Sequence, residues 1–255
     1  MCKHYHNYLL AIGMYAASVS MAQAIETSSL QDAFAFLKSS YVVSLSAGPG
    51  WESAGQNQTF YLTPDIIKTY DANHSTYTFA NGELFLGVKD ALPRQMEGQF
   101  GLALVATGAA KLSGDIWDDA DPLFNNYNYQ YKLNRTALAL KAKLLGQWSL
   151  PVIPWISAAA GVGFNHAYGY TSTPTIPEAV GLPNFASHTV TAFTYAIGVG
   201  VQKSLDPHWQ VGVGYEFSDW GKSQLSEATG QTSGSGLSLN HLYTSSVLVN
   251  LTYLG

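Results

Sequence analysis

The stretch that decides the fold is WQVGVGYEFS at residues 209–218, in which bulky apolar residues alternate with small or polar residues. Successive side chains of a β-strand point to opposite faces, so this alternation predicts a strand with one apolar and one polar face. The apolar set comprises Trp209, Val211, Val213, Tyr215 and Phe217. The opposite set comprises Gln210, Gly212, Gly214, Glu216 and Ser218.

Seven further stretches complete a set of eight predicted strands. Together the strands cover residues 40–51, 76–90, 95–111, 127–146, 152–168, 188–204, 208–220 and 239–254. Within 127–146 the apolar set changes from odd to even positions near Asn134, which predicts a β-bulge there. Short connections near 91–94, 147–151 and 205–207 alternate with long connections near 52–75, 112–126, 169–187 and 221–238. This rhythm predicts an all-β fold, an eight-stranded antiparallel up-and-down transmembrane β-barrel.

The composition agrees with a surface that faces lipid. Charged residues make up 11% of the 255 residues, against about 25% in ordinary soluble domains, and aromatic residues make up 13%. The net charge of -5, with only 12 Lys and Arg, argues against nucleic-acid binding by phosphate neutralisation. No uninterrupted apolar run of 18 residues follows residue 24, so membrane insertion would require a closed barrel. The alternative is a soluble lipocalin-like barrel with its apolar face inside.

The N-terminus has the features of a secretory signal peptide. Lys3 precedes the apolar stretch Leu9–Met21, and Ala22-Gln23-Ala24 provides small residues at a cleavage site. We expect residues 1–24 to be a signal peptide, 25–39 a periplasmic N-terminal segment and 40–255 the barrel. A short N-terminal helix of the mature protein is the alternative. The only cysteine, Cys2, lies within the predicted signal peptide, so a disulfide is not expected after cleavage.

On these features the chain resembles the small eight-stranded outer-membrane barrels of Gram-negative bacteria, grouped with the OmpA transmembrane domain and OmpX and often called the porin family. The resemblance rests on Ala22-Gln23-Ala24, the eight alternating segments and the aromatic C-terminal strand that ends LTYLG at 251–255. It implies a location in the bacterial outer membrane. It also implies a C-terminal aromatic signal for insertion, although here two residues follow Tyr253.

Aromatic residues are expected at the two membrane interfaces, because their rings are amphipathic. At the ends of the strands that meet the long loops, the candidates are Trp51, Phe217, Trp220 and Tyr243. At the ends that meet the short turns, the candidates are Tyr41, Trp148, Trp155, Trp209 and Tyr253.

Several charged residues fall on the predicted inner face, where an isolated charge would be costly and must be paired. This lumen ion network comprises Glu83, Glu97, Arg135, Lys141 and Glu216. The hypothesis is a plugged lumen in which Arg135 pairs with Glu83 or Glu216 and Glu97 pairs with Lys141. The rival is a gated ion path along the same charges.

The sequence favours a structural or surface-interaction role in which four extracellular loops are displayed by a monomeric barrel. The expected partners are outer-membrane lipid and lipopolysaccharide, with a host or surface ligand as a possible partner of the loops. A narrow porin-like channel for small solutes is the alternative. A lipid-modifying enzyme is the third alternative. His241 and Ser245 share a face of one predicted strand, but no carboxylate is predicted beside them to complete a catalytic set. The acidic run Asp115–Asp121 is typical of a solvated loop, with Ca²⁺ binding as its alternative; no catalytic, cofactor or metal site is predicted.

Overall fold

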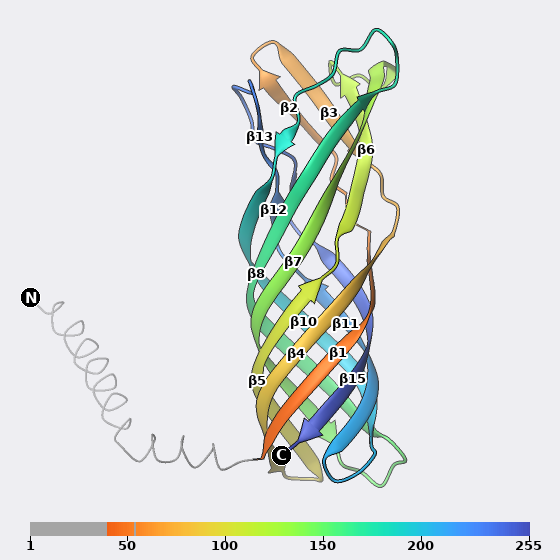
Figure 1. Cartoon of the computed structure of the whole chain (residues 1–255), viewed down its shortest axis with the longest axis vertical. Helices are drawn as coiled ribbons and strands as arrows, with labels where there is room; N and C mark the ends of the chain where they lie inside the picture. The colour runs from red at the N-terminus through yellow and green to blue at the C-terminus, as the bar shows by residue number, and fades with distance from the viewer. Residues whose placement is uncertain (1–39, 54) are drawn as a thin grey trace, which may run out of the picture. The chain divides into compact units, whose positions relative to one another are not determined.

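Eight strands form a closed antiparallel ring in a computed structural model that describes residues 40–53 and 55–255 (Figure 1). The predicted signal peptide at 1–24 and the segment at 25–39 lie outside the described residues. Hydrogen bonding runs in the order β7, β5, β4, β1, β15, β11, β10 and β8, and the pairing of β7 with β8 closes the ring. The ring strands are β1 (Tyr41–Glu52), β4 (Tyr77–Leu92), β5 (Met96–Thr107), β7 (Asn125–Gly146), β8 (Ile153–Pro174), β10 (His188–Ser204), β11 (Trp209–Asp219) and β15 (Tyr243–Leu254). The predicted eight-stranded barrel is confirmed.

Bulky apolar side chains of the ring point outward and polar ones point inward. Val213, Ile197 and Val249 are 43%, 57% and 58% exposed, whereas Glu216 is 6% exposed. A soluble barrel would show the opposite arrangement, so the lipocalin-like alternative is wrong. The outer surface matches that of a barrel surrounded by hydrocarbon. No helix within residues 40–53 and 55–255 has the length and hydropathy needed to cross a membrane.

Above the ring, β7 and β8 continue and carry a further piece of sheet (Figure 1). The upper half of β7 pairs with β6 (Ala110–Asp118), β6 pairs with β3 (Ile66–Ala72), and β3 pairs with β2 (Gln58–Thr63). These three strands and the parts of β7 and β8 beyond the Leu133–Ala167 pair are here called the upper extension. The connections expected near 52–75 and 112–126 are therefore largely β-structure rather than loops.

The outer edge of β2 is covered by the segment that leads into β15. The backbone N–H of Thr232 donates to the Leu62 carbonyl at 2.9 Å. The Gln58 side-chain amide donates to the Ser238 carbonyl at 2.8 Å and accepts from the Ser238 N–H at 3.0 Å. The remaining short elements are η1 (Pro122–Phe124), β9 (Phe185–Ala186), β12 (Ser223–Gln224), β13 (Ser226–Ala228) and β14 (Ser238–Leu239).

The bulge predicted near Asn134 is wrong, because the odd-numbered residues of β7 face inward along the whole strand. Tyr129, Leu133 and Lys141 all face inward. The first two are apolar and Lys141 is charged, because the interior changes from apolar in the upper extension to polar within the ring. The extra residue lies instead in β8, where the register with β7 shifts beside Gly169, whose φ is +65°.

The interior of the upper extension is an apolar core rich in aromatic rings, here called the upper core. Tyr70 packs edge-on against Tyr129 at 5.8 Å between ring centroids, and Tyr170 packs edge-on against Phe185 at 4.9 Å. Its members are Tyr70, Val105, Leu112, Ile116, Tyr127, Tyr129, Tyr131, Leu133, Ala137, Ala167, Tyr170, Phe185, Trp220, Leu225, Ala228, Leu237, Leu239 and Leu242. Some come from the ring and others from the connections before β10 and β15, so the core joins the extension to the top of the barrel.

Replacing Gly169 by Ala is expected to lower the free energy of unfolding by about 1 kcal/mol, because a Cβ disfavours a positive φ. There is open space around that Cβ, so the cost is conformational and not steric. Gly82→Ala is the matched control, since its Cβ would find only ordinary contacts at 3.9 Å and beyond and its φ is not positive. Urea unfolding in detergent micelles would measure both; equal effects would contradict the assignment of the bulge.

The buried tyrosines are expected to resist ionisation. Burial raises the pKa of Tyr70, Tyr129 and Tyr170 above the ordinary value near 10. The folded state therefore favours the neutral phenols, and their contribution to stability is complete below about pH 10. Above that pH the unfolded chain ionises first, so stability falls as the pH rises. Phenolate absorbance should show these residues titrating only on unfolding; a single transition of all tyrosines near pH 10 would refute it.

Candidate functional site

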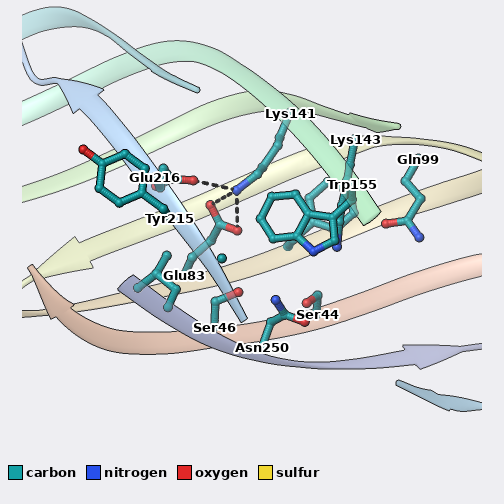
Figure 2. A pocket seen from close by; sticks show the side chains of 13 residues that line it. Ser44, Ser46, Glu83, Gln99, Lys141, Lys143, Trp155, Tyr215, Glu216 and Asn250 are labelled. Atoms are coloured by element: carbon teal, nitrogen blue, oxygen red, sulfur yellow. Dashed lines mark hydrogen bonds and ion pairs between the residues drawn. The ribbon is translucent and has the colours of Figure 1, made fainter. Parts of the chain in front are cut away.

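A three-way ion pair lies inside the ring. The Lys141 ammonium on β7 donates to both carboxylate oxygens of Glu83 on β4, at 2.7 and 2.6 Å, and to Glu216 on β11 at 3.0 Å (Figure 2). All three side chains are buried. The three strands belong to different sectors of the ring, so the ion pair ties opposite walls together across the lumen.

A second lysine lies on the same inward face of β7. The Lys143 ammonium lies one inward position away, donates to the Gln202 side-chain oxygen at 2.6 Å, and lies 4.5 Å from the centroid of the Trp155 ring. Two lysines thus lie among the two carboxylates of this part of the lumen, Glu83 and Glu216 (Figure 2). Buried charges are tolerated when they are paired and hydrogen-bonded. Lys141 meets both conditions, whereas Lys143 contacts only the neutral Gln202 oxygen and the Trp155 ring.

Arg135 pairs with a residue that the sequence analysis did not identify. Its guanidinium donates to Glu52 at the end of β1, and both side chains are fully buried. The guanidinium also lies 4.5 Å from the centroid of the Phe79 ring. The predicted pairing of Arg135 with Glu83 or Glu216 is wrong. The predicted strand ended at residue 51, and one more step of its alternation would have placed Glu52 inside.

Glu97 also lies apart from its predicted partner. It accepts a hydrogen bond from the Gln99 side-chain amide at 2.9 Å and lies 4.0 Å from the Lys89 ammonium. Lys141 pairs in register with Gly101, four residues along β5, which corresponds to about 13 Å. The predicted Glu97–Lys141 pair is therefore wrong, and Glu97 belongs to the lower end of the lumen.

Trp155 and Trp220 are inside the barrel and not at the membrane interfaces where they were predicted. Trp155 lies over glycines of β10 and β11: a Cβ on Gly200 or Gly214 would come within 2.4 Å of the indole. Trp220 is 3% exposed and donates to the Thr244 hydroxyl at 3.1 Å. The alternation of side chains along a strand explains both positions. Each tryptophan lies two residues from a serine that faces inward, so its side chain points the same way.

The other predicted interface aromatics lie on or near the outer surface at the two ends of the ring. At the upper end Phe217 stacks on Tyr243 at 5.8 Å between ring centroids. At the lower end Tyr253 contacts both Tyr41 and Trp209. The full set is Tyr41, Trp51, Trp148, Trp209, Phe217, Tyr243 and Tyr253.

The side chains leave little free space in the described part of the lumen. One cavity of about 30 Å³ borders Trp155, Lys143 and Glu83, and another of about 20 Å³ lies beside Trp220. A single water needs roughly 10–15 Å³ on this scale, so each cavity has room for at most a few waters. The ion pairs and Trp155 therefore occupy the lumen as a plug.

The His241 imidazole lies near a carboxylate that the sequence analysis missed. Its Nδ1 is 2.9 Å from an oxygen of Asp219, at the upper end of β11. The Ser245 hydroxyl bonds instead to the Tyr215 hydroxyl at 2.7 Å. His241 and Ser245 are thus not joined to each other by a hydrogen bond.

The carboxylates of the run Asp115–Asp121 are distributed among different contacts. Asp118 pairs with Lys68, and the Asp121 side chain accepts from the Leu123 N–H at 2.9 Å as the cap of η1. Within residues 40–53 and 55–255, no three His, Cys, Asp or Glu side chains converge as a metal site would require.

Comparisons with known proteins find similarity only at the level of structure. No protein-family model matches the chain, and no curated protein matches it. Neisserial surface protein A is 11% identical with a TM-score of 0.40, and the match covers 84% of this chain and 96% of that one. Ail, the attachment invasion locus protein of Yersinia pestis, is 11% identical with a TM-score of 0.39, covering 85% and 99%. OprG from Pseudomonas aeruginosa is 12% identical with a TM-score of 0.42, covering 85% and 97%. The assignment of the fold rests on the closed ring itself.

Removing the central cation should destabilise the barrel strongly. Lys141→Met leaves Glu83 and Glu216 buried without their partner, and we expect a loss of about 3–5 kcal/mol in the free energy of unfolding. Adding Glu83→Gln and Glu216→Gln should recover much of this loss, because the uncompensated charges are then gone.

Lys89→Met is the matched control for this series, because Lys89 is less buried than Lys141 and lies 4.0 Å from Glu97, too far for a hydrogen bond. We expect a change below about 1 kcal/mol there. Urea unfolding measures these three variants beside the unmodified protein. A Lys141→Met variant as stable as the control would contradict the plugged lumen.

Proposed function

We propose that this protein is an integral β-barrel of the bacterial outer membrane with a closed lumen and a structural and surface-interaction role. The observation that carries the proposal is the filled interior of a ring whose outer surface is apolar. Such a ring satisfies its backbone hydrogen bonds internally, as a membrane-spanning barrel must. The upper extension then projects from the membrane on the side where the longer connections lie.

Two successive obstacles support a closed lumen. Within the ring, Lys141, Glu83 and Glu216 join different walls, and Trp155 lies beside them. Above this network the upper core draws Leu225 and Leu242 from the connections between β11 and β15 into the interior. Opening a path for solutes would require breaking buried ion pairs and moving a packed apolar core. The interior thus favours a structural role over the narrow-channel alternative.

The tip of the upper extension supports a role in surface recognition. Leu123 is 88% exposed and Val180 is 80% exposed, although they lie on different connections. The Tyr127 hydroxyl donates to the Val180 carbonyl at 2.9 Å, which ties the second connection to β7. Large apolar side chains with this degree of exposure at the end of a projecting sheet are candidates for contact with a partner. We expect the molecule to present this tip from a monomeric barrel.

The closed lumen predicts that the refolded protein, inserted in a planar lipid bilayer, gives no stable current steps. A general porin inserted in the same bilayer serves as the control for sensitivity. The Trp155→Ala variant should also stay closed, because the upper core remains. Reproducible openings of the unmodified protein would refute the closed lumen and favour the narrow channel.

A further inference from the structure

Two lysines lie side by side on the outer face, just below the upper extension's polar surface. Lys111 on β6 and Lys132 on β7 are direct partners in register, and both are exposed. Side chains opposite each other on antiparallel strands have Cβ atoms about 4.5–5.5 Å apart, and like charges at this spacing destabilise a sheet. Neither ammonium has a carboxylate within 4.0 Å among the described residues. A pair of this kind is a natural site for an anion.

The height of this lysine pair matches the polar layer of a membrane. Phe164 on β8 is 44% exposed and pairs in register with Thr136, four residues below Lys132 on β7. Four residues correspond to about 13 Å along the strand, and to about 10 Å in height for a strand tilted by roughly 40°. Farther down the same face, Leu138 and Leu140 are exposed. The lysines thus stand one headgroup layer above a surface suited to acyl chains.

Above the lysines, the same face forms a polar hollow of about 730 Å³. One row of partners in register crosses four strands there, from Asp71 to Asp115, Asn128 and Thr173. A second row, nearer the lysines, includes Gln130 and Thr171. The volume lies within the usual range for a ligand site of about 300–1,000 Å³.

Most of the polar groups in this hollow have no partner in the protein. The side chains of Asp115, Asn128, Gln130, Thr171 and Thr173 make no side-chain hydrogen bond with the rest of the described chain. Asp71 is held by Asn57, whose amide donates to it at 2.5 Å. Amides, hydroxyls and the Asp115 carboxylate thus lie free in one concave surface. They suit the many hydroxyl groups of a sugar, since together they offer both donors and acceptors.

We propose that three surfaces on β6, β7 and β8, namely the exposed apolar side chains, the lysine pair and the polar hollow, together bind one molecule of a phosphorylated glycolipid. Such a lipid is found in lipopolysaccharide of the outer leaflet. Its acyl chains lie along Leu138 and Phe164, a phosphate lies between Lys111 and Lys132, and its sugars enter the hollow. The proposal rests on the proposed outer-membrane location and names the lipid partner of that barrel. Its basis is the order of three surfaces, apolar, cationic and hydrogen-bonding, which is the order of the three parts of such a lipid.

The test uses the refolded full-length barrel in detergent and native mass spectrometry with a purified lipopolysaccharide that carries phosphorylated lipid A and core sugars. The double variant Lys111→Gln and Lys132→Gln should bind it at least about tenfold more weakly, since charge-assisted hydrogen bonds are the strong ones. The control double variant, Lys203→Gln with Lys222→Gln, removes the same charge from exposed positions elsewhere and should bind as the unmodified protein does.

Further binding measurements test the phosphate, the sugars and the lipid separately. Dephosphorylated lipopolysaccharide should bind the unmodified protein as weakly as the intact lipid binds the lysine variant. Asn128→Ala with Gln130→Ala should weaken binding of the complete lipid but not of lipid A without its core sugars. Inorganic phosphate and phosphatidylglycerol should not compete at matched concentrations.

Equal losses in the two lysine variants, or effective competition by phosphatidylglycerol or inorganic phosphate, would overturn the proposal in favour of unspecific anion binding. Failure of the closed lumen is distinguishable from this outcome, because it is read from bilayer currents and not from bound lipid. A protein that conducts while retaining the glycolipid would refute only the closed lumen. A barrel that carries no current and binds no glycolipid would refute only this inference.

Discussion

The structure depends on one constraint: in hydrocarbon, every backbone N–H and C=O must find a partner within the protein. The chain meets this constraint by closing β7 on β8 after seven other pairings around the ring. Closure fixes the two faces of every strand, so each residue of the ring faces either lipid or the lumen. The apolar exterior and the charged interior are therefore two results of the same hydrogen-bonded geometry.

The narrow interior then has to be filled without leaving a charge unpaired. Lys141 meets this need with two carboxylates, and Arg135 meets it with Glu52. Trp155 fills the adjacent space because Gly200 and Gly214 have no side chain to obstruct it. Above these polar contacts the filling becomes apolar, where the walls rise past the membrane and a conventional hydrophobic core can form. The barrel thus has two kinds of interior, one above the other.

The ring was predictable because alternation with a period of two is a direct consequence of strand geometry. Errors arose where the interior changed its chemistry. Tyr129 and Leu133 are inward and apolar, while Lys141 is inward and charged, so polarity alone suggested a bulge that is absent. Trp155 was predicted at a membrane interface because it is aromatic, although the alternation along its strand places it on the inward face. The hairpin of β2 and β3 carries no strong alternation, and the partners of Arg135 depend on distances between strands that a sequence does not reveal.

The clamp between Gln58 and Ser238 has a consequence for how neighbouring molecules behave. β2 is the last strand of the open sheet, and a bare edge invites a strand from another copy to add to it. Here a side-chain amide both donates to and accepts from the Ser238 backbone, imitating the exchange between two strands. The imitation occupies the edge without extending the ladder. The covered edge therefore offers fewer free backbone groups to a strand from a second copy.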